Sequence, residues 1–559
     1  MDIKAKQAGR DGMLTAGRLL PLIAAVALTV TGPATQALAE SGRSGRVSET
    51  VDRRVHDAAP DTLIPVVVQT RGPVSEGHLA RLHGRGGALK TKHNAIDGYS
   101  ALVPAGAIGE LADDADVDRI SYDFPVHAFM DVALRAVRGD LAPAGPGGLD
   151  GRGIGIALID TGVANHDDLD RGKGPAQVTE VEFVGHEQGL VDYFGHGTHV
   201  AGILSGSGAD SSGPDAFRTF RGVAPGARLL SLRALRPDGT GTTSDVLAAI
   251  DWVQLHRRSS NIRIVNLSLG HPIEESYTTD PLCRALRGLV ASGVVVVVAA
   301  GNGGRTGSGF GTIMSPANDP SVITVGAMDT NRTVAREDDI LAPYSAKGPT
   351  LVDQIVKPDL VAPGSFIVSL RAAGSWLDLN HHELVLRTGD YSTAAPRDGD
   401  GAYMILSGTS MSTPMVSGAA ALLLQQDPSL DPADVKARLM ATAAKDDLMP
   451  FETGAGYLDI AAALASTARA ESALSPRAVP GQDGELAFLP LAGSWNGNWD
   501  QTLIWGRDRM LGTMAATEND RVTASGLVWG GGPSLDALTL VWGGGQSVEA
   551  STLVWGGGQ

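Results

Sequence analysis

The stretch Leu406-Ser407-Gly408-Thr409-Ser410-Met411-Ser412-Thr413-Pro414 leads into an apolar, alanine-rich run from Met415 to Leu424. Two small residues, Gly408 and Thr409, followed by such a run predict a tight turn that enters a buried helix. Ser410 then stands at or near the helix N-terminus, where backbone N–H groups point outward and the helix dipole favours negative charge. Two interpretations stay open at this point, an ordinary N-cap serine and a serine used for chemistry.

Short apolar runs alternate with helical segments from Gly151 to about Ala470. Such runs are typical of strands buried on both faces of a parallel sheet, and Ser244–Leu255 and Pro281–Ala291 are typical of the helices between them. Ser244 is the expected N-cap of the first helix, and Gly293 the expected end of the second. We predict an α/β fold with a doubly wound, mostly parallel sheet flanked by helices, which binds ligands at the carboxyl ends of its strands. The apolar runs are Ile154–Ile159, Arg228–Leu232, Ile262–Leu267, Val294–Ala299 and Val322–Val325.

Polar residues of three kinds stand at these strand ends and turns. Asp160 closes the first strand, where a buried carboxylate needs specific hydrogen bonds. His196 and His199 are flanked by glycines but lack the third ligand and helix-borne Glu of a zinc motif, so one histidine is better assigned as a base and the other as packed structure. Asn302 lies in a glycine turn, where a simple turn role is the alternative. Together with Ser410 these residues supply the nucleophile, base, carboxylate and oxyanion donor that acyl transfer needs.

The order Asp, His, Ser along the chain is the subtilisin order. The matching motifs are Ile159-Asp160-Thr161-Gly162, Gly195-His196-Gly197-Thr198-His199-Val200-Ala201-Gly202, Asn266-Leu267-Ser268-Leu269-Gly270, Ala299-Ala300-Gly301-Asn302 and Gly408 to Pro414. At these residues the sequence resembles the subtilisin-like serine proteases (subtilases, peptidase S8 family) over about residues 131 to 465.

The resemblance implies a serine endopeptidase that acts on proteins or peptides and requires no cofactor for its chemistry. Asp160 would orient His196, His196 would be the general base and then the acid, and Ser410 would be the nucleophile. Asn302 and the Ser410 backbone N–H would form the oxyanion hole, and His199 would be structural.

The same resemblance implies where a substrate binds. Gly239-Thr240-Gly241 and Ser268-Leu269-Gly270 would be edge segments that hold a peptide as an added strand. The first pocket would be walled by 268–270 and by Ala299-Ala300-Gly301, with Met314 at its floor. These walls carry no acidic residue, so we expect bulky apolar residues, rather than Arg or Lys, before the scissile bond.

Residues 1–39 have the composition of a secretory signal peptide. Basic residues up to Arg18 precede an apolar run, Leu19 to Val30, and the small-residue site Ala37-Leu38-Ala39, so we expect export and cleavage after Ala39. The run is too short to span a bilayer, and no later apolar segment reaches the roughly 18 residues of a membrane span. We therefore expect a secreted protein that is soluble and monomeric.

Residues 40–130, with an ordered core at about 62–129, precede the peptidase region. Their β-α-β-β-α-β-like pattern, which includes predicted strands Thr62–Gln69 and Ala95–Val103, predicts a small ferredoxin-like α+β module. The resemblance implies an inhibitory propeptide of the I9 type, which would act as an intramolecular inhibitor. Its extended end implies self-cleavage near Phe129 or Met130.

After the predicted peptidase domain, 131–467, residues 468–559 are rich in Gly and Trp. A Trp-Gly unit recurs at Trp505, Trp529, Trp542 and Trp555. Two interpretations stay open: a partly ordered glycine-rich tail, and a surface-docking segment that would make the protein an adhesin with the peptidase domain as scaffold.

Composition excludes several partners. The net charge is −17 without a long basic run, so nucleic acid and anionic membrane surfaces are poor candidates. The lone cysteine, Cys283, excludes a disulfide framework. Asp210 and Asp215 lie in a long loop and could bind a structural calcium ion, but solvated loop carboxylates are the commoner explanation, and we assign no metal ligand. The insertion 372–403 has no role that the sequence reveals.

Overall fold

The computed structural model describes residues 46–123, 125–128, 148–169, 178–185, 191–331, 336, 338–393, 398–445, 448–480 and 486–491. These residues belong to one compact unit of the chain. The predicted signal peptide, the predicted cleavage residues Phe129 and Met130, and the four Trp-Gly units lie outside the described residues.

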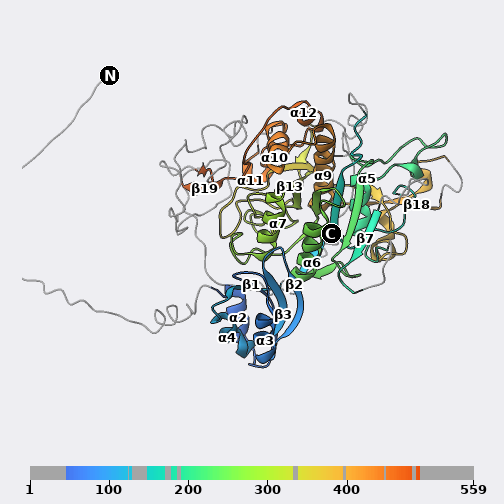
Figure 1. Ribbon diagram of the computed structural model, residues 1–559. Coiled ribbons are helices and arrows are strands. Elements are labelled where there is room, and N and C mark those ends of the chain that lie inside the picture. Colours follow the sequence, from blue (N-terminus) through green and yellow to red (C-terminus); the bar gives the residue numbers. More distant parts are fainter. Residues whose placement is uncertain are drawn as a thin grey trace, which may run out of the picture. The chain divides into compact units, whose positions relative to one another are not determined.

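An eight-stranded sheet forms the centre of the predicted peptidase region, and its strands β13 and β7 are labelled in Figure 1. The strand order is β14-β13-β12-β10-β6-β8-β7, with β15 beside β13. All its described pairings are parallel except that of β14. The order reverses at β6, and ligands of open α/β sheets bind beyond the carboxyl ends of the strands at such a reversal, here β6 and β10. The predicted α/β, mostly parallel fold is confirmed. The strands are β6 Gly155–Asp160, β7 Val178–Glu182, β8 Arg228–Arg233, β10 Ile262–Leu267, β12 Val295–Ala299, β13 Ile323–Asp329, β14 Ile340–Leu341 and β15 Leu360–Pro363.

Helices cover both faces of this sheet because successive strand side chains point to opposite faces. Ile156 and Leu158 of β6 lie in the same core as α5 and α9, whereas Ala157 and Ile159 lie in a second core with α6 and α7. Both cores are apolar, which is why the strands read as continuous apolar runs. The helices of this region are α5 His196–Ser205, α6 Thr243–His256, α7 Pro281–Ala291, α8 Trp376–Asn380, α9 Thr409–Gln426, α10 Pro432–Ala441, α11 Pro450–Thr453 and α12 Ile460–Ala465.

The start of α6 differs from the sequence prediction. Its N-cap is Thr242, whose side chain accepts a hydrogen bond from the Asp245 N–H, while the Asp245 side chain accepts from the Thr242 N–H. This capping box places the N-cap two residues before Ser244, so the prediction of Ser244 as N-cap is wrong. Gly293, with φ of 91°, follows the end of α7 as predicted.

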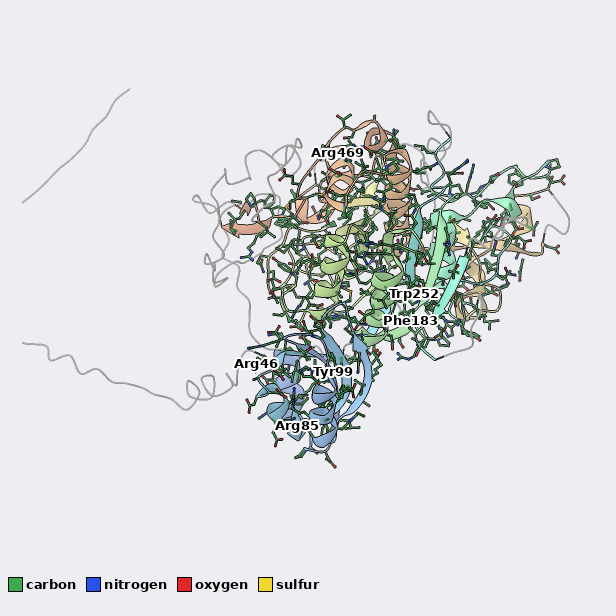
Figure 2. All side chains as sticks on the ribbon, in the orientation of Figure 1. Arg46, Arg85, Tyr99, Phe183, Trp252 and Arg469 are labelled. Carbon is green, nitrogen blue, oxygen red and sulfur yellow. The ribbon has the colours of Figure 1, made fainter. Side chains whose placement is uncertain are left out.

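A small module, residues 46–123, precedes the peptidase region and has a four-stranded antiparallel sheet in the order β2-β3-β1-β4. Tyr99, labelled in Figure 2, is 1% exposed in its core. The predicted strand Ala95–Val103 begins only at Gly98, and the preceding strand β2, polar and half exposed, gave no apolar signal. The elements are α2 Glu49–Asp57, β1 Leu63–Thr70, α3 Glu76–Gly84, β2 Ala88–His93, β3 Gly98–Pro104, α4 Ile108–Ala112 and β4 Val117–Tyr122.

The chain after residue 467 continues to pack on the peptidase core. Strands β19 (Arg477–Pro480) and β20 (Leu486–Leu489) pair antiparallel, and the Phe488 ring meets that of Phe451 edge-on at 5.7 Å. The Ser475 hydroxyl donates to Asp359 at 2.5 Å, and Asp359 is an acceptor for two buried lysines, Lys357 and Lys436, at 2.6 and 3.0 Å. No helix among the described residues is long and apolar enough to cross a membrane.

Candidate active site

The predicted carboxylate and imidazole lie in contact at the edge of the sheet. Asp160 ends β6, and His196 is the first residue of α5. Asp160 Oδ1 accepts hydrogen bonds from His196 Nδ1 at 2.7 Å and from the Thr161 N–H at 2.8 Å. Both side chains are at most 1% exposed, so the pair is well shielded from water. A carboxylate on Nδ1 fixes the tautomer in which Nε2 carries the lone pair that can accept a proton.

Asp192, which the sequence analysis missed, holds the loop before His196. Its Oδ1 accepts from the Thr161 hydroxyl and from the Phe194 and Gly195 N–H groups, at 2.9, 3.2 and 2.7 Å. Its Oδ2 accepts from the Thr198 N–H and hydroxyl at 2.8 and 2.7 Å. Burial raises the pKa of Asp192, and these hydrogen bonds oppose the rise. The signal in the sequence is an acid four positions before His196, among apolar residues.

Ser410 is the second residue of α9 and is fully buried. The N-cap of that helix is Gly408, so an ordinary capping serine does not describe Ser410. Its hydroxyl lies 3.4 Å from the Ser268 carbonyl oxygen, and the Ser268 hydroxyl donates to the Ser410 carbonyl oxygen at 3.0 Å. Because α5 and α9 pack against each other, the helices that carry His196 and Ser410 in their first turns are neighbours.

Asn302 offers a hydrogen-bond donor at the start of α9. Its Oδ1 accepts from the N–H and hydroxyl of Thr409 at 3.0 and 3.1 Å. Its Nδ2 is buried and has no hydrogen-bond partner among the described residues. Leaving a buried donor unpaired is costly, and donors of this kind stabilise developing oxyanions in acyl-transfer enzymes. Thr409, which also accepts from the Gly301 N–H at 3.2 Å, is a second residue that the sequence analysis missed.

The two predicted edge segments lie on either side of a strand from the chain itself. Strand β5 (Pro125–Ala128) is the middle of a three-stranded antiparallel sheet, between β9 (Thr240–Thr242) and β11 (Leu269–Gly270). The pairs are Val126 with Gly241, His127 with Thr240 and Gly270, and Ala128 with Leu269. Gly239, with φ of 78°, leads into β9.

The predicted pocket walls are small and buried. Ser268, Ala299 and Ala300 are fully buried, and the backbone of Gly301 has φ of 111°. A Cβ at Gly301 would lie 2.9 Å from Met314 Cγ, so the Met314 side chain lies directly against this wall. The residues of these walls carry no charge.

His199 hydrogen-bonds to backbone carbonyl groups. It is fully buried, and its Nε2 is 3.1 and 3.3 Å from the carbonyl oxygens of Ile367 and Met404. Burial, with a smaller contribution from His196, lowers the pKa of His199 to about 3. A neutral imidazole that links two carbonyl groups is a structural element.

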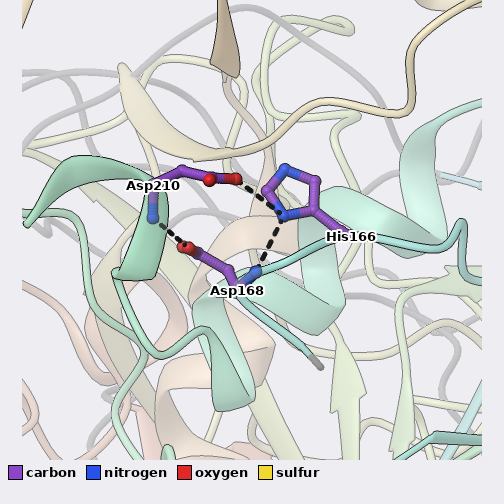
Figure 3. A group of neighbouring side chains, drawn as sticks. All are labelled: His166, Asp168 and Asp210. Atoms are coloured by element: carbon purple, nitrogen blue, oxygen red, sulfur yellow. Dashed lines mark hydrogen bonds and ion pairs between the residues drawn. The ribbon is translucent and has the colours of Figure 1, made fainter. Parts of the chain in front are cut away.

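Three potential metal ligands, His166, Asp168 and Asp210, lie together (Figure 3). Their polar atoms already form hydrogen bonds within the group, with the backbone and with Tyr403. His166 Nδ1 accepts from the Asp168 N–H at 3.2 Å, and Asp168 accepts from the Asp210 N–H at 2.8 Å and from the Tyr403 hydroxyl at 2.9 Å. Asp215 does not join them; its carbonyl oxygen accepts from Thr393. Hydrogen bonding accounts for the cluster, and we assign no cation to it.

A buried Asp–His pair, a buried serine at a helix start and an unpaired amide donor beside it define the site of a serine hydrolase. The added strand next to that serine narrows the class to enzymes that bind extended peptides.

Comparison with known proteins identifies the family. The family model described as the subtilase family matches residues 151–456, and the chain belongs to that family. It is therefore a serine endopeptidase, and its chemistry needs no cofactor.

Known relatives agree with this assignment. Serine protease AprX of Bacillus subtilis (strain 168) is 36% identical over 378 residues, which cover 66% of this chain and 80% of the relative. Subtilisin DY of Bacillus licheniformis is 32% identical over 319 residues, 56% of this chain and 92% of the relative. The fold is similar to that of fervidolysin from Fervidobacterium pennivorans, a keratinolytic enzyme related to subtilisin, with a TM-score of 0.55 and 22% identity over 72% of this chain and 61% of fervidolysin.

Proposed function

We propose that this subtilase is an exported endopeptidase, made as a self-inhibited precursor, that cleaves after bulky apolar residues. Ser410 is the nucleophile, His196 the general base and then the acid, and Asp160 the residue that orients His196. The Ser410 hydroxyl attacks the carbonyl carbon of the scissile bond while His196 takes its proton. His196 then protonates the leaving amine, and a water molecule hydrolyses the acyl-enzyme by the same route.

The oxyanion of each tetrahedral intermediate accepts hydrogen bonds from Asn302 Nδ2 and the Ser410 backbone N–H. The unpaired Nδ2 of Asn302 supports this role. Oδ1 of the same side-chain amide accepts two hydrogen bonds from Thr409, and the amide cannot turn over without losing both.

The observation that carries the proposal is the position of β5. Its last described pair joins Ala128 to Leu269, one residue from Ser268, whose carbonyl oxygen lies next to Ser410 Oγ. An antiparallel partner occupies both edge segments in this way when a peptide is bound as an added strand. We therefore assign substrate binding to 239–241, 268–270 and 299–301, and self-cleavage to the peptide bond after Phe129 or Met130.

Contacts of the small module support its role as an intramolecular inhibitor. The Asp123 carboxylate accepts hydrogen bonds from the N–H and hydroxyl of Ser244 in the first turn of α6, both at 2.8 Å. Arg119 pairs with Glu275 at 2.7 Å, and both side chains are at most 16% exposed. The Asp123 bonds adjoin the pairing of Pro125 with Thr242, and the Arg119–Glu275 pair anchors the module at a second point.

The apolar pocket supports a preference for bulky apolar residues before the scissile bond, since Met314 and the walls offer no charge to a basic side chain. Peptide substrates that differ only at that residue test this preference. We expect kcat/KM for Phe to exceed that for Arg by about 10-fold or more. Equal values would contradict the assignment.

Labelling and sequencing test the proposal as a whole. A fluorophosphonate should label the processed wild-type protein and should not label Ser410→Ala, and the variant should remain an uncleaved precursor. N-terminal sequencing of the secreted wild type should give a start at residue 130 or 131. Absence of labelling would favour a pseudoenzyme that binds peptides, and a start near Glu40 would exclude self-cleavage at this site.

The alternative function, a surface adhesin that uses the Trp-Gly repeats, concerns residues outside the described part of the chain. Because Ala470, Ala478 and Phe488 pack on the peptidase core and the described residues end at 491, the deletion that tests it removes 492–559. Loss of surface retention with unchanged peptidase activity would support an adhesin role alongside the enzyme.

A further inference from the structure

The insertion between β16 (Ile367–Leu370) and the second half of β18 (Asp400–Leu406) approaches the active site from two sides. Strands β16 and β17 both pair with β18, and β18 runs directly into α9, which carries Ser410. The other part of the insertion is the short helix α8, which packs against the residues before His196. The elements of the insertion are α8 Trp376–Asn380, η4 His382–Leu384, β17 Val385–Arg387 and η5 Thr388–Asp390.

Helix α8 binds the backbone of the loop that leads to His196. The Trp376 N–H donates to the Tyr193 carbonyl oxygen at 2.7 Å, and the Leu377 N–H donates to the Phe194 carbonyl oxygen at 3.0 Å. These bonds satisfy two N–H groups at the start of α8 that have no partner within the helix. A Cβ at Gly195, the N-cap of α5, would lie 2.5 Å from Ser375 Oγ, so the insertion also closes on the residue next to His196.

An aromatic contact extends from the insertion to the substrate strand. The rings of Trp376 and Phe194 are stacked, with centroids 5.4 Å apart and an interplanar angle of 13°. The Phe194 ring also covers Gly239, where a Cβ would lie 2.6 to 2.9 Å from three ring carbons. Gly239 precedes β9, the strand that pairs with β5. Contacts from Trp376 to Phe194 and from Phe194 to Gly239 therefore connect the insertion to the segment that holds the substrate strand.

A buried ion pair fixes α8 to its own base. Arg371 binds both oxygens of Asp378, at 2.6 and 3.0 Å, and the Gly374 N–H donates to the same carboxylate at 2.7 Å. The side chains of Arg371 and Asp378 are 11% and 4% exposed. Bidentate, charge-assisted pairs of this kind hold a defined geometry, so α8 is a firm support for Tyr193, Phe194 and Gly195.

We propose that the insertion 372–403 is a positioning element of the active site. Trp376 fixes Phe194 and Ser375 fixes Gly195, and together they set the place of His196 relative to Ser410 and to a peptide bound beside Gly239. Trp376 is a positioning residue, since it acts through Phe194. The inference rests on the proposed roles of His196 and Ser410.

The test compares Trp376→Ala, Trp376→Phe and the control Leu379→Ala, whose side chain lies on the same helix and is 71% exposed. The readouts are kcat and KM on a peptide p-nitroanilide, the pH profile of kcat/KM, the rate of fluorophosphonate labelling and the thermal midpoint. We expect Trp376→Ala to lower kcat and the labelling rate about 10-fold, since a small misplacement of a catalytic group costs up to about 100-fold. The acid limb of its pH profile should shift, because His196 changes its surroundings.

Trp376→Phe, which keeps a stacked ring, should retain most of the activity, and Leu379→Ala should match wild type. A wild-type kcat and pH profile for Trp376→Ala would overturn the inference. So would a loss of kcat that only matches a smaller fraction of sites titrated by the label, because that result would indicate misfolding. If wild type is not labelled at Ser410 at all, the proposed function fails instead.

Discussion

Replacing Asp192 with Asn should destabilise the turn that holds His196, with little change in shape. The substitution is made in a Ser410→Ala background, which prevents self-digestion. Asp192 accepts five hydrogen bonds, two of them from Thr198 at Oδ2. The less damaging orientation of an amide places its NH₂ group towards Thr198, because the Thr198 hydroxyl can turn and accept, whereas the Thr198 N–H cannot.

The expected loss of stability follows from the backbone N–H of Thr198, which loses its acceptor. A buried donor left without its partner costs about 1–3 kcal/mol. The loss of charge-assisted bonds adds to this cost, while removal of a buried carboxylate, whose pKa is raised by burial, offsets part of it. We therefore expect the free energy of unfolding to fall by about 2 kcal/mol. Where local opening governs exchange, the Thr198 amide should exchange roughly 30-fold faster.

Denaturant unfolding measures the first effect, and hydrogen exchange of the peptide that contains Thr198 measures the second. Asp215→Asn is the matched control, because it makes the same chemical change at an exposed loop position. In an active background, Asp192→Asn should also lower kcat. An unfolding free energy and a Thr198 exchange rate equal to those of the control would refute the assigned role of Asp192.

Three further predictions follow from the same structure. The variant Asn302→Asp keeps the side-chain acceptor for Thr409 but removes the unpaired Nδ2 donor. We expect kcat to fall about 10²–10³-fold, the range known for subtilisin itself. An unchanged kcat would exclude Asn302 from the oxyanion hole. The pKa of His199 is about 3 in the folded chain, against an ordinary value of 6.5, so its contribution to stability is complete above pH 6.5 and is lost as pH falls towards 3. In His199→Gln the free energy of unfolding should therefore depend less on pH between 6.5 and 3. An unchanged dependence would contradict the assignment. A Ser410→Ala chain that ends at residue 467 should have a thermal midpoint roughly 5 °C or more below that of a Ser410→Ala chain that ends at residue 491. The shorter chain loses the buried Phe488 ring and the hydrogen bond from Ser475 to Asp359. Equal midpoints in calorimetry would show that 468–491 is not part of the core.

Much of the fold is predictable because its pattern is local. A strand buried on both faces is apolar at most positions, so β6, β8, β10 and β12 are visible as nearly continuous apolar runs. The start of α6 was misplaced because Thr242, Ser244 and Asp245 are all good capping residues, and only the geometry of the capping box decides among them. Strand β2 was missed because one face is exposed and polar, and it pairs with only one neighbour.

The sequence by itself determined the α/β class, the chemical types at the site and their order along the chain, since these depend on residue identity and on short-range periodicity. Only the tertiary structure decided the 2.7 Å contact of His196 with Asp160, the unpaired donor of Asn302 and the support of Phe194 by Trp376. Each of these joins elements far apart in the chain. Their geometry depends on how side chains pack between those elements, and no local pattern records it.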